Sequence, residues 1–89
     1  MKLLLIQGAN MRSLGRRQPS LYGATTAREL DALLRERARA LRVSLDVLYT
    51  DHEGEAVAEI ERAGFDGLLI NPAGFLHGGR ALRDCLAAL

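Results

Sequence analysis

The sequence has 89 residues, which is enough for one small domain spanning residues 1–89 and no more. Twelve basic residues nearly cancel eleven acidic ones, so the net charge of +1 gives no reason to expect nucleic acid or an anionic membrane as a partner. Hydrophobic residues make up 48% of the chain, and this proportion excludes a disordered, highly charged segment.

The chain shows no sign of a secretory leader, a membrane span or an internal disulfide. Its first residues, MKLLLIQGAN, carry an apolar run that is too short for a signal-peptide core or a membrane span. The only cysteine, Cys85, falls in an apolar helical pattern, so we interpret it as a packing residue. Because a lone thiol suits a reducing compartment, we expect a cytoplasmic protein without a membrane partner.

The first predicted element is a short strand over residues 3–6. The run LLLI has no polar alternation and stops at Gly8, which is typical of a strand buried on both faces of a parallel sheet. A long connection with three glycines and a proline follows, to about residue 25. Connections of this length inside a small domain are usually functional or disordered.

A helix is predicted over residues 27–41. Thr26 and Glu29 fit the S/T-x-x-E capping box, which places the helix start. The apolar stripe of this helix consists of Leu30, Leu33, Leu34 and Leu41. Glu29 and Glu36 are close enough to share a face with the arginines at 35, 37, 39 and 42, so we interpret this face as a solvated surface.

The rest of the chain repeats the same alternation of strand and helix. Residues 43–49 alternate in polarity and predict a second strand, after which Asp51 is placed to cap a helix that Gly64 ends. Residues 67–70 predict a third buried strand, halted by Asn71-Pro72, and a last helix runs from residue 79 or 80 to the end.

This β-α-β-α-β-α order predicts an α/β fold with a parallel sheet and right-handed crossovers. In a doubly wound sheet of order 2-1-3, the apolar third strand lies at an edge, where it is a pairing hazard. We therefore expect something to cover it: further chain, a second copy or a partner.

Two loops carry most of the unusual polar residues. In open α/β sheets, ligands bind beyond the carboxyl ends of the strands, and the ends of the first and third strands are neighbours here. Five side chains are thus candidates for one cleft: Asn10, Arg17, Tyr22, Asn71 and His77. Taken singly, the asparagines could cap turns, His77 could stand at a helix entry, Tyr22 could anchor its loop, and Arg17 could be solvated.

No metal or nucleotide motif is present. The segment Asp51-His52-Glu53-Gly54-Glu55 has one histidine, whereas a zincin helix needs two histidines four residues apart. We interpret its acidic residues as favouring a helix N-terminus. The glycines near Gly8 do not form G-x-G-x-x-G, and no Walker-type lysine follows, so we expect neither a dinucleotide nor a nucleoside triphosphate.

Several ordered blocks of the chain resemble the type II 3-dehydroquinate dehydratases of the shikimate pathway. The blocks run from Gly8-Ala9-Asn10 through Arg17-Gln18-Pro19 and Tyr22-Gly23 to Asp51-His52-Glu53-Gly54-Glu55, Ile70-Asn71-Pro72 with Gly74 and His77, and Ala81-Leu82-Arg83-Asp84. The resemblance implies a flavodoxin-like domain of five parallel strands, so this chain would be truncated before strands 4 and 5. It also implies trimers that stack into dodecamers.

The resemblance further implies a reaction: anti elimination of water from 3-dehydroquinate through an enolate, without a metal or cofactor. Tyr22 would remove the proton beside the ketone, and Arg17 would favour its anion, because a phenol of pKa about 10 is otherwise a poor base. Asn10 would hold the water that stabilises the enolate oxygen. Asn71 and His77 would bind substrate hydroxyls and carboxylate, and Asp84 would reach a neighbouring subunit's site.

The sequence also departs from the family pattern. Ala9 replaces a proline, Gln18 replaces a glutamate beside Arg17, and Gly78-Gly79 replace Thr-Ser after the histidine. The family's fourth strand ends in His-x-Ser-Asn, whose histidine is the general acid, and no counterpart occurs in these 89 residues. An alternative hypothesis is therefore a non-catalytic flavodoxin-like binding or assembly module that keeps the cleft without the acid.

Overall fold

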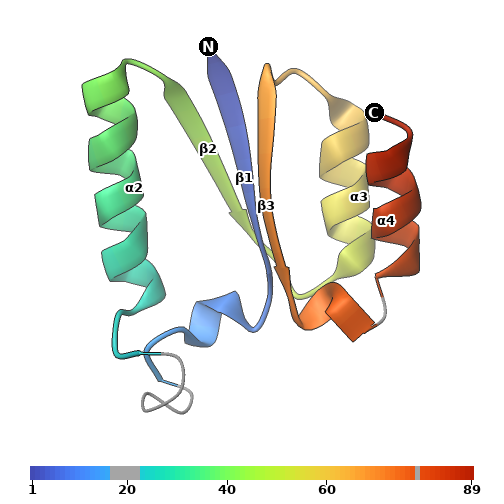
Figure 1. The fold of residues 1–89 in the computed structure, drawn as a ribbon, viewed down its shortest axis with the longest axis horizontal. Helices are drawn as coiled ribbons and strands as arrows, with labels where there is room; N and C mark the ends of the chain where they lie inside the picture. The colour runs from blue at the N-terminus through green and yellow to red at the C-terminus, as the bar shows by residue number, and fades with distance from the viewer. Residues whose placement is uncertain (17–22, 78) are drawn as a thin grey trace.

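The computed structural model of the chain describes residues 1–16, 23–77 and 79–89, and its three strands form one parallel sheet in the order β2-β1-β3 (Figure 1). The strands are β1 (Lys2–Ala9), β2 (Ser44–Tyr49) and β3 (Gly67–Ala73). Helix α2 (Ala27–Leu41) lies on one side of the sheet, and α3 (Glu53–Arg62) and α4 (Arg80–Ala87) lie on the other. This is the flavodoxin-like α/β arrangement of order 2-1-3 that the sequence predicts.

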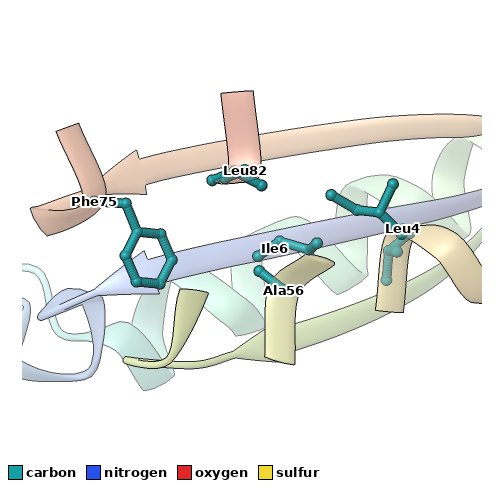
Figure 2. Close-up of a cluster of buried hydrophobic side chains, with 6 residues drawn as sticks. Leu4, Ile6, Ala56, Phe75 and Leu82 are labelled. Atoms are coloured by element: carbon teal, nitrogen blue, oxygen red, sulfur yellow. The ribbon is translucent and has the colours of Figure 1, made fainter. Parts of the chain in front are cut away.

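The core lies between the sheet and the pair α3 and α4. Leu4 and Ile6 of β1 gather there with Ala56 of α3 and Leu82 of α4, and Phe75 closes one end of the cluster (Figure 2). Ile6 and Ala56 are fully buried. The central strand is thus apolar and covered, as predicted, because it has neighbours on both edges. Cys85 is half-buried against the same cluster, which confirms its packing role.

Two short 3₁₀ helices follow the strands at the carboxyl edge of the sheet. η1 (Met11–Ser13) comes directly after β1, and η2 (Gly74–His77) comes directly after β3. Both lie at the same end of the molecule in Figure 1. The two loops that the sequence predicts to meet therefore begin side by side.

Helix α2 begins and ends where the sequence predicts. The Thr26 hydroxyl accepts a hydrogen bond from the backbone N–H of Glu29 at 3.1 Å, and the Glu29 carboxylate accepts one from the N–H of Thr26 at 3.2 Å. The predicted apolar stripe is only partly buried, however. Leu30 and Leu34 are half-buried, whereas Leu33 and Leu41 are 61% and 60% exposed.

Strand β3 continues past the point where the sequence predicts its end. It runs through Asn71 and Pro72 to Ala73, with Asn71 beside Gln7 and Ala73 beside Ala9 of β1. A proline is tolerated because β3 is an edge strand and its missing N–H can face outward. Gly8 permits the close pairing, since a Cβ at that position would lie 2.3 Å from the carbonyl oxygen of Pro72.

None of the helices in the described part of the chain is both long and apolar enough to cross a membrane.

Candidate active site

The carboxyl edge of the sheet brings together polar side chains from all three strands. The register places Gln7 of β1 between Tyr49 of β2 and Asn71 of β3. Residues paired in a parallel register point to the same face, so these three side chains form a row on the face that α2 partly covers. Of the three, the sequence predicts a site role for Asn71 alone.

Asn10 follows β1 in a left-handed backbone conformation, with φ of 74°. Its N–H donates a hydrogen bond to the Asp51 carboxylate at 3.0 Å. The side chain of Asn10 lies against the start of η2, because a Cβ on Gly74 would come within 2.9 Å of its Nδ2 atom. The loop after β1 and the loop after β3 therefore meet at Asn10, as the sequence predicts.

The predicted capping role of Asp51 is wrong. The residue before α3 that occupies the N-cap position is His52, and no side chain caps that helix by a hydrogen bond. Asp51 instead spans from the end of β2 to the end of β1 and holds the backbone of Asn10. An aspartate before a helix resembles a cap in sequence, and its distant partner becomes visible only once the strands are paired.

Asn71 reaches back over the sheet edge to η1. Its Nδ2 atom lies 3.6 Å from the Met11 sulfur, which is a weak acceptor. On the other side of η1, Nη2 of Arg12 donates to the carbonyl oxygen of Tyr49 at 2.8 Å. η1 is thus tied to both β3 and β2 and lies across the end of β1. Arg12 was not among the predicted site residues, because it stands in a loop among several arginines.

The hydroxyl of Tyr49 donates to the Asp31 carboxylate of α2 at 3.0 Å and lies 3.4 Å from the Ala27 carbonyl oxygen. Burial, together with the hydrogen bond and charge of Asp31, raises the pKa of Tyr49 to about 12, although a hydrogen bond from Gln7 opposes the rise. Gln7 itself is only 3% exposed. The sequence signal that could have marked Gln7 as a site residue is its place directly after the apolar run of residues 3–6.

The remaining predicted site residues are not joined to this edge by the described contacts. Arg17 and Tyr22 lie outside the described residues, and so does the side chain of His77. Asp84 is exposed on α4, and the hydrogen bonds and ion pairs found among the described residues include none from its side chain. The structure therefore brings together Asn10 and Asn71 and leaves the other four assignments as predictions.

The residues around His52 do not form a metal centre. Across residues 1–16, 23–77 and 79–89, no group of three or more histidine, cysteine, aspartate or glutamate side chains is arranged to hold a metal ion. The His52 N–H donates to the Thr50 hydroxyl at 3.0 Å, which fixes the turn into α3. Asn10 and Asn71 offer amides at the sheet edge, and amides bind hydroxyl groups and oxyanions by hydrogen bonds.

Comparison with known proteins identifies the family that this chain matches. The family model for dehydroquinase class II matches residues 1–89. The chain is 45% identical to a 3-dehydroquinate dehydratase of Roseiflexus castenholzii over all of this chain and 58% of that protein. It is 42% identical to 3-dehydroquinate dehydratase 2 of Corynebacterium efficiens over all of this chain and 63% of that protein.

Solved structures agree with the sequence comparison. A type II dehydroquinase from Butyrivibrio crossotus superposes with a TM-score of 0.94 at 33% identity, covering 99% of this chain and 63% of that one. A type II dehydroquinase from Propionibacterium acnes gives a TM-score of 0.88 at 38% identity, covering 99% of this chain and 62% of that one. The chain spans roughly three fifths of the length of these relatives. On its sequence and its fold, the chain belongs to the dehydroquinase class II family.

Proposed function

We propose that the chain acts on 3-dehydroquinate and removes water from it to form 3-dehydroshikimate. The observation that carries this proposal is the family match over residues 1–89, combined with the meeting of Asn10 and Asn71 at one edge of the sheet. The reaction is an anti elimination through an enolate, so the protein must supply a base, a stabiliser of the enolate oxygen and contacts to hold the substrate.

Tyr22 is the proposed base, and Arg17 its activator. A phenol with its ordinary pKa of about 10 is almost fully protonated at neutral pH. Each unit by which a neighbour lowers that pKa corresponds to about 1.4 kcal/mol, so two or three units require a few kcal/mol from a cation such as Arg17. The loop with its glycines and proline would let the pair close over the substrate and exclude water.

Asn10 is the proposed stabiliser of the enolate oxygen, through a water that its amide holds. Its support is the tie to Asp51, which fixes the backbone, and the close approach of Gly74, which limits where the amide can turn. Preorganised donors of this kind lower a barrier because they need no reorientation as charge develops.

Asn71 and His77 are the proposed contacts to the substrate's hydroxyl and carboxylate groups, and Asp84 the proposed contact to a neighbouring subunit's site. The exposed position of Asp84 on α4 is compatible with a contact made outside its own subunit. We accordingly propose a cytoplasmic homo-oligomer built from trimers, without a cofactor.

A second candidate function is a binding or assembly module without catalysis. One observation favours it: the 89 residues contain two histidines, His52 and His77, and neither stands in a His-x-Ser-Asn segment. If no other residue replaced this acid, the elimination would be slower by roughly 10²–10⁴-fold. Such a module would bind 3-dehydroquinate and release it unchanged.

A turnover assay separates the two candidates. The chain is mixed with 3-dehydroquinate, and the ultraviolet absorbance of the conjugated enone product is followed, with Tyr22→Phe as the matched variant. We expect product formation that Tyr22→Phe abolishes. Product formation at an unchanged rate in Tyr22→Phe would refute the assignment of Tyr22 as the base, and binding without any product would favour the module.

A further inference from the structure

The row Tyr49, Gln7 and Asn71 contains a buried atom that the arrangement leaves without a partner. The Oε1 atom of Gln7 is buried and accepts no hydrogen bond from any described residue. An amide oxygen in such a position has lost its hydrogen bonds to water and gained none in return. Native structures rarely retain a group of this kind without a role.

The contact between Gln7 and Tyr49 indicates which end of the Gln7 amide is free. The one proton of the Tyr49 hydroxyl goes to the Asp31 carboxylate, which can only accept. A hydrogen bond from Gln7 to this hydroxyl opposes the rise of the Tyr49 pKa, which is the effect of a donor, so the NH₂ group of Gln7 is the end that serves Tyr49. The Oε1 atom is the end left over, and the other neighbour of Gln7 in the row is Asn71.

Asn71 is within reach and is weakly held. Gln7 and Asn71 are paired across adjacent parallel strands, which lie about 4.8 Å apart, and their side chains share one face of the sheet. The Nδ2 atom of Asn71 contacts the Met11 sulfur at 3.6 Å, so a rotation toward Gln7 replaces a sulfur acceptor by an amide oxygen. The rotation would satisfy the buried Oε1 atom and lose only a weak contact.

We propose that Gln7 is a positioning residue, whose Oε1 accepts a hydrogen bond from Nδ2 of Asn71 and holds that amide in one orientation toward the ligand. The result is a chain of contacts, Asp31 to Tyr49 to Gln7 to Asn71, that runs from α2 across the whole sheet. The inference deepens the proposed function and rests on it for the identity of the ligand.

Fixing Asn71 in this way determines what it can bind. One proton of its NH₂ group is committed to Gln7, and the other proton and the Oδ1 atom remain for the ligand. An adjacent donor and acceptor suit the hydroxyl groups of a small polyol, since each hydroxyl both donates and accepts. If the Asn71 amide were free to flip, it would offer its donor and its acceptor in either order. It would also lose rotamer entropy when the ligand bound.

Two variants distinguish the two possible acceptors of Asn71. The ¹⁵N-labelled 89-residue chain is studied by NMR, and the side-chain NH₂ signals of Asn71 are assigned by their loss in Asn71→Asp. Gln7→Met keeps the shape of Gln7 and removes its amide, whereas Met11→Leu keeps the volume of Met11 and removes its sulfur. We expect the Asn71 signals to move upfield in Gln7→Met and to stay in place in Met11→Leu. The reverse pattern in two folded variants would overturn the inference.

A measurement on the unaltered chain covers the case in which Gln7→Met fails to fold. A scalar coupling through the hydrogen bond, between Nδ2 of Asn71 and Cδ of Gln7, should be detectable. Absence of this coupling, in a spectrum that resolves the backbone couplings between β1 and β3, would equally overturn the inference.

Ligand binding separates this inference from the proposed function. In a Tyr22→Phe background, which does not consume the substrate, 3-dehydroquinate should bind roughly 3–10-fold more weakly to Gln7→Met than to Met11→Leu. Equal binding alongside the expected NMR shift would refute the positioning role. If 3-dehydroquinate binds none of the chains, the proposed function fails, and the Asn71 signals still decide whether Gln7 holds Asn71.

Discussion

At the scale of single residues, Asn10 has two separable properties. Its backbone lies in the left-handed region, which asparagine and glycine tolerate better than other residues, and its amide faces the loop after β3. The sequence could predict the amide from the family resemblance. It could not predict the tie to Asp51, because the two residues are 41 positions apart in the chain.

Two substitutions separate these properties of Asn10. Asn10→Gly keeps the left-handed backbone, so we expect a free energy of unfolding near that of the parent chain, while Asn10→Ala should lose about 1 kcal/mol. Turnover should fall in both, by about 10²-fold, because both lose the amide. Urea unfolding and the enone assay measure the two effects. Arg42→Gly, at another left-handed residue, is the control and should leave turnover unchanged.

If Asn10→Gly turned over substrate at the parent rate, the amide would have no part in stabilising the enolate. If instead Asn10→Gly and Asn10→Ala were equally destabilised, the left-handed backbone would not be the cause of the loss.

Tyr49 predicts a pH dependence of stability. Its pKa is raised from 10.0 to about 12 by burial and by Asp31. Between these two values the unfolded chain has released the phenolic proton and the folded chain retains it, so the free energy of unfolding falls as the pH rises through this window. Below pH 10 the contribution is complete. We expect the decline, measured by urea unfolding at pH 9 and pH 11, to be smaller in Tyr49→Phe, and an identical decline would contradict this reading.

At the scale of secondary-structure elements, the helices were more predictable than the strand ends. The capping box of Thr26 and Glu29 is local in sequence, so the bounds of α2 could be predicted. The end of β3 could not, because Asn71-Pro72 is an ordinary stop signal and its continuation depends on Gly8 of another strand. The burial of Gln7 and the exposure of Leu33 likewise depend on which elements pack above them.

The junction of β1 and β3 gives a direct test at this scale. Gly8→Ala would place a Cβ against the backbone of Pro72, so we expect a loss of about 1–3 kcal/mol in the free energy of unfolding. Gly54→Ala, on α3 with no atom within 4 Å of the added methyl group, should instead gain about 0.5–1 kcal/mol. Thermal and urea unfolding of both variants provide the comparison. Equal stability of the two would show that Gly8 is not needed for the pairing.

At the scale of the whole molecule, the sheet has an apolar strand at its edge. Among the described residues no strand pairs with the outer edge of β3, and Leu69 of that strand is 51% exposed. The order 2-1-3 and the edge position of β3 were predicted from the alternation of strands and helices. What covers this edge was left open by the sequence, because burial of an edge depends on chain or subunits that a local pattern does not encode.

The proposed reaction also belongs to the scale of the whole molecule, because we expect its base and its acid to come from different parts of the fold. The proposed base, Tyr22, and its proposed activator, Arg17, lie within these 89 residues, which contain no His-x-Ser-Asn segment. Proton abstraction and departure of the hydroxyl are separate steps in an elimination through an enolate. The first step can therefore be observed even where the second is slow.

The most direct measurement is the rate at which deuterium enters 3-dehydroquinate at the carbon beside its ketone, followed by NMR in D₂O with the 89-residue chain. We expect the chain to accelerate incorporation of deuterium at one of the two hydrogens there, and Tyr22→Phe to remove the acceleration. Incorporation no faster than in buffer alone, by a folded chain that binds the substrate, would contradict the claim that Tyr22 is a working base in this protein.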